Sequence, residues 1–115
     1  MIRQASGMVP EKRERMRGGD GTVTLTPALQ PGDYDAGLRL FSRITLPAGA
    51  SIGYHIHEGE EELFYFLAGT AEFNDNGEIR TVHAGDATVT RSGQGHSVRN
   101  TGDVPVEILA VIASL

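Results

Sequence analysis

Short apolar and polar stretches alternate along most of the chain, and apolar residues recur at every second position in many of them. Valine, isoleucine, threonine, phenylalanine and tyrosine are frequent there, and a period of two places alternate side chains on opposite faces of a strand. Glycine-containing turns separate the stretches. The pattern predicts an all-β protein with strands at residues 22–26, 37–46, 51–57, 62–67, 70–74, 78–83, 87–90, 96–100 and 106–112.

Turn residues support these boundaries. The tripeptide Asp75-Asn76-Gly77 lies between two alternating segments, and an Asn-Gly pair accepts the positive φ angles of a tight hairpin. Further turns are expected at residues 47–49, 84–86 and 101–103. The segment from Pro10 to Arg17 is the one helical candidate. It is too short and too charged to be a stable helix alone, so we expect a single helical turn or irregular chain there.

The predicted elements suit a single domain. A chain of 115 residues is long enough to bury a real core. Short strands in this number favour a closed barrel or a two-sheet sandwich. No internal repeat, low-complexity tract or linker divides the chain. We therefore predict an N-terminal arm at residues 1–20 and one β-barrel domain at residues 21–115.

The charge distribution distinguishes this arm from the rest of the chain. The formal net charge is -5, yet five of the ten Lys and Arg residues lie in the arm. The acidic remainder disfavours nucleic acid as a partner, because phosphate binding requires a basic face. We expect the arm to be a solvated terminus, with contact to a partner chain as the alternative. Its basic residues are Arg3, Lys12, Arg13, Arg15 and Arg17.

Cysteine content and hydropathy narrow the chemistry and the compartment. The chain has no cysteine, which excludes disulfides, thiolate metal ligands and a cysteine nucleophile. A metal site must therefore use nitrogen and oxygen donors. No apolar stretch is long enough to span a bilayer, and no apolar signal segment follows Met1-Ile2-Arg3-Gln4. We expect a soluble, cytoplasmic protein without a membrane partner.

Two histidines share one face of a predicted strand. In His55-Ile56-His57 the imidazoles are two positions apart, so both project from the same side while Ile56 faces the other way. This arrangement can clamp a metal ion from two directions. A His-x-His pair is also common without a metal, so further donors are needed to support a site.

Four glutamates compete to supply a carboxylate to this pair. Glu62 is favoured because it opens the apolar strand and shares a face with Phe64 and Phe66, and Glu61 is the alternative. For Glu58, Glu60 and Glu61 a solvated acidic turn is the simpler interpretation.

His96 supplies a candidate fourth donor from a distant strand. Three neutral imidazoles and one carboxylate leave open positions on a divalent Mn, Fe, Co, Ni or Zn ion. Open positions are typical of catalytic rather than structural metal sites. The residues therefore predict one transition-metal ion held by His55, His57, His96 and either Glu62 or Glu61.

These residues resemble the two sequence motifs of the cupin family, and the resemblance covers most of the chain. The first motif is glycine, five residues, His-x-His, three or four residues, glutamate, six residues and glycine. Its spacing selects Glu62, because six residues separate Glu62 from the closing glycine, whereas Glu61 would leave seven. The matching positions are Gly49, His55, His57, Glu62 and Gly69.

The second motif is glycine, five residues, Pro-x-Gly, two residues, histidine, three residues and asparagine. One position departs, because Arg91 stands where the family usually has proline, which weakens the rigid turn expected before His96. The resemblance implies a double-stranded β-helix, or jelly-roll barrel, with the metal inside. It also implies that Gly69, Gly85 and Gly93 serve turns and that Asn100 supports the fold.

The resemblance favours a metal-dependent enzyme acting on a small carboxylate-bearing metabolite, because similar single-domain cupins are described as oxalate-decarboxylase-like. Decarboxylase, dioxygenase, lyase and isomerase chemistry all suit the same ligands. The candidate catalytic residues are Glu61, Tyr65 and Arg43. Tyr65 has the opposite parity to the ligands, so only a bulge would turn it inward. Arg39 and Arg43 share a strand face, where an inward arginine would anchor a carboxylate, although a surface position is favoured.

Other functions remain open at this level. A non-catalytic barrel that binds or senses a small molecule needs the same residues, and a sugar-related isomerase is a further alternative. An interaction module is a third possibility. We expect a homodimer formed through Leu63, Tyr65, Leu67 and the apolar C-terminal strand at residues 106–115.

Overall fold

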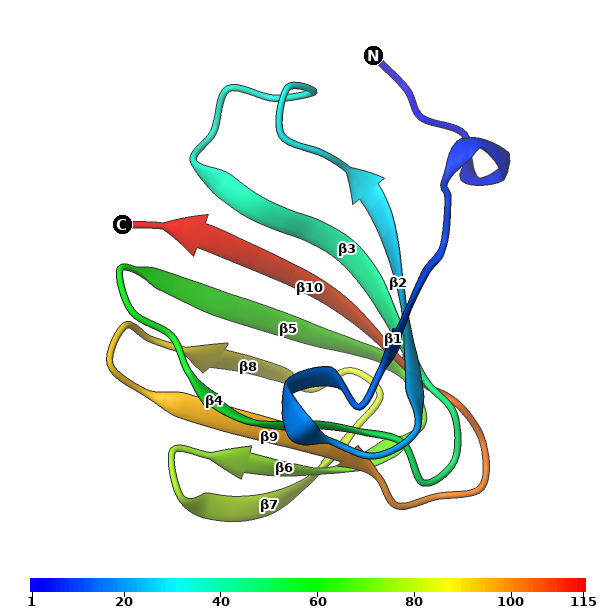
Figure 1. Ribbon diagram of the computed structural model, residues 1–115, viewed down its shortest axis with the longest axis vertical. Helices are drawn as coiled ribbons and strands as arrows, with labels where there is room; N and C mark the ends of the chain where they lie inside the picture. Colours follow the sequence, from blue (N-terminus) through cyan, green and yellow to red (C-terminus); the bar gives the residue numbers. More distant parts are fainter.

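The alternating segments pair into two antiparallel sheets in the computed structural model, which describes residues 1–115 (Figure 1). The six-stranded sheet has the order β1-β2-β3-β10-β5-β8, and the four-stranded sheet has the order β4-β9-β6-β7. Together they form the predicted jelly-roll sandwich. The strands are β1 Glu11–Glu14, β2 Thr22–Leu29, β3 Leu38–Leu46, β4 Ser51–Ile56, β5 Glu60–Ala68, β6 Thr70–Asp75, β7 Glu78–His83, β8 Ala87–Thr90, β9 Gly95–Asn100 and β10 Val106–Ser114.

The strands predicted from the alternating pattern are confirmed as β2 to β10. The predicted hairpin is confirmed as well. Asp75 pairs with Glu78, and the two residues between them, Asn76 and Gly77, have φ angles of 51° and 100°. The Asn74 side-chain oxygen accepts a hydrogen bond from the Gly77 amide at 2.8 Å, which stabilises the turn.

The N-terminal segment differs from the prediction. The expectation of a helical turn or irregular chain from Pro10 to Arg17 is wrong for β1, which pairs antiparallel with β2. All four β1 side chains are exposed, so no apolar alternation marks this strand in the sequence. A short 3-10 helix, η2 (Met16–Gly18), follows β1, and another, η1 (Ala5–Gly7), precedes it. No helix in the structure is long and apolar enough to cross a membrane.

The core lies between the two sheets and is filled by alternate residues of the strands. In β5, Phe64 and Phe66 are buried while Leu63, Tyr65 and Leu67 are exposed, as a period of two requires. Every second residue of β10 from Val106 to Ile112 is buried in the same way. This packing fixes the register of the strands that carry the polar cluster described below.

The segment before β10 is held by two residues that the cupin motifs contain. The buried Asn100 side chain donates hydrogen bonds to the carbonyl oxygens of Leu46 at 2.9 Å and Val104 at 2.8 Å. Gly69 has a φ of 86°, and a Cβ atom there would lie 2.7 Å from the Pro105 carbonyl oxygen. Both residues therefore serve the fold, as the resemblance implies.

Candidate metal centre

Three strands bring four polar side chains to one point inside the sandwich. His55 lies in β4 and pairs directly with His96 of β9, while His57 follows the end of β4. Glu62 comes from β5 in the opposite sheet. The side chains of His57, Glu62 and His96 are almost completely buried. The cluster therefore joins the two sheets from within.

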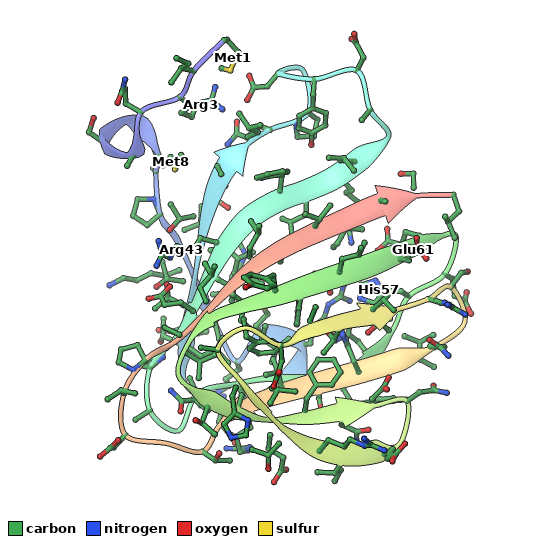
Figure 2. The ribbon with its side chains drawn as sticks, turned by 180° about the vertical axis from the view of Figure 1, so that it is seen from behind. Met1, Arg3, Met8, Arg43, His57 and Glu61 are labelled. Atoms are coloured by element: carbon green, nitrogen blue, oxygen red, sulfur yellow. The ribbon has the colours of Figure 1, made fainter.

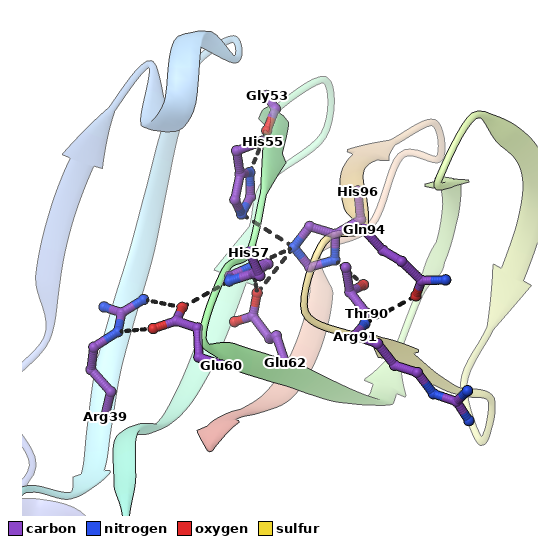
Figure 3. A network of polar contacts seen from close by, with 10 residues as sticks. All are labelled: Arg39, Gly53, His55, His57, Glu60, Glu62, Thr90, Arg91, Gln94 and His96. Atoms are coloured by element: carbon purple, nitrogen blue, oxygen red, sulfur yellow. Dashed lines mark hydrogen bonds and ion pairs between the residues drawn. The ribbon is translucent and has the colours of Figure 1, made fainter. Parts of the chain in front are cut away.

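The donor atoms of the cluster face one another. The Nε2 atom of His96 lies 3.2 Å from the Nε2 atoms of both His55 and His57. The Oε1 atom of Glu62 lies 3.0 Å from His96 Nε2 and 3.1 Å from His57 Nε2. One ligand atom from each of the four residues lies within 4.8 Å of all the others. Figure 3 shows this convergence.

The opposite ring nitrogens are all occupied by other partners. His55 Nδ1 donates to the Gly53 carbonyl oxygen at 2.7 Å, and His57 Nδ1 donates to a Glu60 carboxylate oxygen at 2.8 Å. His96 Nδ1 lies 2.8 Å from the buried Thr90 hydroxyl. A carbonyl and a carboxylate can only accept, so the Nδ1 atoms of His55 and His57 carry the protons.

In their neutral forms, His55 and His57 therefore direct Nε2 lone pairs at the same point as the Glu62 carboxylate, and His96 does the same when Thr90 accepts its Nδ1 proton. Lone pairs and a negative charge at these distances repel one another unless a cation or proton lies among them. Three imidazole nitrogens and one carboxylate oxygen are ordinary donors for divalent transition metals. The donor set therefore fits a metal ion, and the group is positioned to bind one.

Burial and neighbouring charge shift the ionisation of the cluster. Burial lowers the pKa of His55, and the positive charge of Arg17 acts in the same direction. The hydrogen bond with Glu62 raises the pKa of His57 against the effect of burial. Burial works to raise the pKa of Glu62, but hydrogen bonds with His57 and His96 outweigh it and lower that pKa below its usual value. Glu62 is therefore a carboxylate at neutral pH.

Glu60 and Arg39 support His57 from behind. Arg39 donates two hydrogen bonds to the Glu60 carboxylate, at 2.8 and 2.9 Å, and that carboxylate accepts the His57 Nδ1 proton (Figure 3). The Arg39 guanidinium, assisted by His57, holds the pKa of Glu60 at about 2. The interpretation of Glu60 as part of a solvated turn is therefore wrong. Its spacing was the available signal, because Glu60 lies two positions before Glu62 and shares its face.

A bulge explains why Arg39 reaches this network. Ile112 pairs with Leu40 and Ala113 pairs with Leu38, so Arg39 has no partner in the register between β3 and β10. A bulged residue can turn its side chain in a direction that strict alternation does not allow. Nothing in the local sequence marks this bulge.

An open cavity of about 230 Å³ lies beside the cluster. His55, His57, Glu62 and His96 form its polar floor. Apolar walls reduce contact with water, which strengthens electrostatic interactions beside them. The apolar lining residues are Met16, Leu25, Leu40, Ile44, Ile52, Phe64, Val98 and Ile112, and the remaining polar ones are Glu11, Arg13, Arg17, Arg39 and Ser97.

The structure does not bring the three candidate catalytic residues to this cavity. Arg43 points outward and donates to a Glu107 carboxylate oxygen at 2.9 Å, and Figure 2 shows it well apart from His57. The Tyr65 side chain is exposed on the outer face, as its parity predicts. Glu61 faces away from Glu62 and does not line the cavity. The cavity instead contains residues of the N-terminal segment, which the sequence interpretation assigned to a solvated arm.

Comparison with known proteins agrees with the fold. The family model described as "Cupin domain" matches residues 42–112. An oxalate-binding protein from Thermotoga maritima is 44% identical over the whole chain and 95% of its own length. The crystal structure of a predicted oxalate decarboxylase from Thermotoga maritima is 43% identical, covers 100% of both chains and superposes with a TM-score of 0.96. The tetracenomycin polyketide synthase protein TcmJ of Streptomyces glaucescens is 27% identical over 96% of this chain and 69% of its own.

Proposed function

Because this chain belongs to the cupin family, we propose that its four converging donors hold one divalent transition-metal ion and that its cavity binds a small carboxylate. The observation that carries the proposal is the convergence of the three histidine Nε2 atoms and the Glu62 carboxylate oxygen on one point. When bound, the ion supplies a Lewis acid with free positions for ligand oxygens. Candidate ions are Mn, Fe, Co, Ni and Zn.

Oxalate is the first ligand to test. The name of the Thermotoga maritima sequence relative and the description of the Thermotoga maritima crystal structure both refer to oxalate, and arginine residues that line the cavity favour an anion. The apolar walls add a dry surrounding in which charge attraction is stronger than in water. The cavity volume of about 230 Å³ limits the ligand to a small molecule.

Metal analysis and calorimetry test both parts of the proposal. Elemental analysis of protein purified without added metal or chelator is expected to find about one divalent transition-metal ion per chain. Titration with oxalate is expected to give binding to the metal-loaded wild type and none to His57→Ala, which loses a ligand. Equal oxalate binding by both proteins would contradict a role for the metal.

Decarboxylation is a second candidate function, because the cavity contains a carboxyl group in addition to the four candidate metal ligands. Glu11, a carboxylate paired with Arg13, lines the cavity and can relay a proton from solvent to the bound ligand. Cleavage of the oxalate C–C bond releases carbon dioxide, and a proton added to the remaining carbon gives formate. We expect formate release by metal-loaded wild type and at least about a hundredfold less by Glu11→Gln. Oxalate binding without formate production would identify a binding protein instead.

We further propose that the chain forms a homodimer through the outer face of the six-stranded sheet. Leu63, Tyr65, Leu67 and Val89 are each more than 40% exposed there, on the neighbouring strands β5 and β8. Adjacent exposed apolar side chains favour burial against a second copy. Light scattering is expected to give twice the 12.3 kDa chain mass for wild type and the chain mass for Tyr65→Asp. Ile79→Asp, at an exposed apolar position of β7, is the control and should remain dimeric.

A further inference from the structure

The N-terminal segment from β1 to η2 forms one wall of the cavity beside the metal cluster. Its side chains Arg13 and Arg17 line that cavity together with Arg39 of β3. Figure 1 shows η2 lying against β4, the strand that carries His55. Three arginine residues therefore line the cavity where a cation is also expected, and such a concentration of positive charge favours an anionic ligand.

Two of these three arginines already have a carboxylate partner within the chain. Arg39 donates two hydrogen bonds to Glu60, and Arg13 lies 3.3 Å from a Glu11 oxygen. The Arg17 side chain makes no hydrogen bond and no ion pair, although it lines the cavity. Arg17 is therefore the one guanidinium of the cavity whose charge is available to a ligand.

The turn that carries Arg17 is built tightly against β4. A Cβ atom on Gly53 would lie 2.1 Å from the Arg17 carbonyl oxygen, and one on Gly19 would lie 2.2 Å from the Ser51 carbonyl oxygen. Arg15 and Arg17 both have left-handed backbone, with φ angles of 50° and 55°. This conformation is unfavourable for arginine and persists only where the surroundings impose it. The fold therefore determines where the Arg17 backbone lies.

The net charge of the groups around the cluster indicates the net charge of the ligand that the site favours. The two paired arginines and their glutamates contribute no net charge. A divalent cation together with the Glu62 carboxylate has one net positive charge, and Arg17 adds a second. A dianion balances both charges, whereas a monoanion leaves one uncompensated in a partly apolar cavity, which is unfavourable.

We propose that Arg17 is a specificity-determining residue that binds the second carboxylate of a small dicarboxylate. This inference rests on the carboxylate binding proposed above and adds a preference for dianions. The planar guanidinium donates two parallel hydrogen bonds that match the two oxygens of a carboxylate. One carboxylate group then lies at the metal cluster and the other at the η2 wall.

Isothermal titration of manganese-loaded protein with oxalate and with glycolate tests this role, because both ligands have two carbons and only oxalate is a dianion. Arg17→Asn is the test variant, since asparagine tolerates left-handed backbone. Arg15→Asn is the matched control, because it removes the same charge from the same turn at a residue that does not line the cavity. We expect Arg17→Asn to weaken oxalate binding at least about tenfold and glycolate binding less than about twofold.

The remaining outcomes separate this inference from the proposed function. Arg15→Asn should keep wild-type affinities for both ligands. Arg17→Lys keeps the charge but lacks the planar guanidinium, so its affinity for oxalate should lie between those of wild type and Arg17→Asn. Wild-type oxalate preference in Arg17→Asn would overturn the role of Arg17 alone. Equal losses in Arg17→Asn and Arg15→Asn would overturn it in favour of a general charge effect. Failure of manganese-loaded wild type to bind either ligand would overturn the proposed function and this inference together.

Discussion

The structure distinguishes the two adjacent glutamates as candidate metal ligands. Glu62 is buried with its Oε1 atom 3.0 Å from His96 Nε2, whereas Glu61 faces the other side of β5. We expect Glu62→Gln to lower metal affinity at least about tenfold and Glu61→Gln to leave it unchanged, because only the former removes a donor charge. Competition with a fluorescent chelator measures both affinities. The reverse ranking would show that the ligand assignment is wrong by one residue.

Glu60 should make the stability of the metal-free protein depend on acid pH. Its pKa is about 2 in the folded chain against an ordinary value of 4.5, so its stabilising effect is complete above about pH 4.5 and is lost as the pH falls toward 2. Glu60→Gln should cost about 1 kcal/mol at pH 7, because solvent screens this partly exposed group, and nearly nothing at pH 2.

Urea unfolding of chelator-treated wild type and Glu60→Gln at pH 7, 4 and 2 measures this difference. Glu58→Gln is the matched control, since Glu58 is an exposed carboxylate of the same turn without an ion pair. A difference between wild type and Glu60→Gln that is constant across the pH range would contradict the assigned contacts. Glu60→Gln should also lower metal affinity about tenfold or more, because the Glu60 carboxylate orients His57.

At the scale of single elements, the docking of η2 on β4 can be tested by adding one methyl group. Gly19 has an extended φ of -75°, so alanine meets no backbone restriction there, but its Cβ would lie 2.2 Å from the Ser51 carbonyl oxygen. We expect Gly19→Ala to lower the free energy of unfolding by about 1 to 3 kcal/mol.

Gly7→Ala provides the control for this prediction. Gly7 lies in η1, which precedes β1, and a Cβ atom there would meet no heavy atom within 4 Å. Urea unfolding should therefore give wild-type stability for Gly7→Ala. Equal stability of Gly19→Ala and wild type would contradict the close packing of η2.

The elements that sequence reasoning predicted are those with a local signal. Most strands from β2 to β10 contain apolar residues at alternate positions, and the hairpin at Asn76-Gly77 follows from the backbone preferences of that pair. Strand β1 has only exposed residues, so its pairing with β2 is not visible in the pattern. The bulge at Arg39 is equally hidden, because it depends on the register with β10.

The four candidate metal ligands were also predictable from a local signal. The spacing of His55, His57, Glu62 and His96 identified four side chains that the structure brings together. Residues that surround them depend on long-range contacts. Arg39 requires the bulge, and Arg17 requires the docking of η2 on β4, so neither position follows from strand periodicity.

At the scale of the whole molecule, the metal cluster connects the two sheets. His55 and His96 belong to the four-stranded sheet and Glu62 belongs to the six-stranded sheet. A metal ion bound only by the folded chain stabilises it, by about 2.7 kcal/mol at a concentration one hundred times the Kd. We expect the Tm to rise on adding Mn²⁺ and to fall on adding a chelator. His57→Ala should not show this rise in Tm on adding Mn²⁺, whereas His83→Ala, which changes an exposed histidine, should show it.

The position of β1 at the edge of the six-stranded sheet has an evolutionary consequence. The residues that fill the interior and those of β1 and η2 that line the cavity occupy different stretches of the chain, so mutations in one stretch need not disturb the other. Descendants of one ancestral barrel can thus change this wall of the cavity through a few mutations near the N-terminus while inheriting intact the strands that carry the histidine and glutamate cluster.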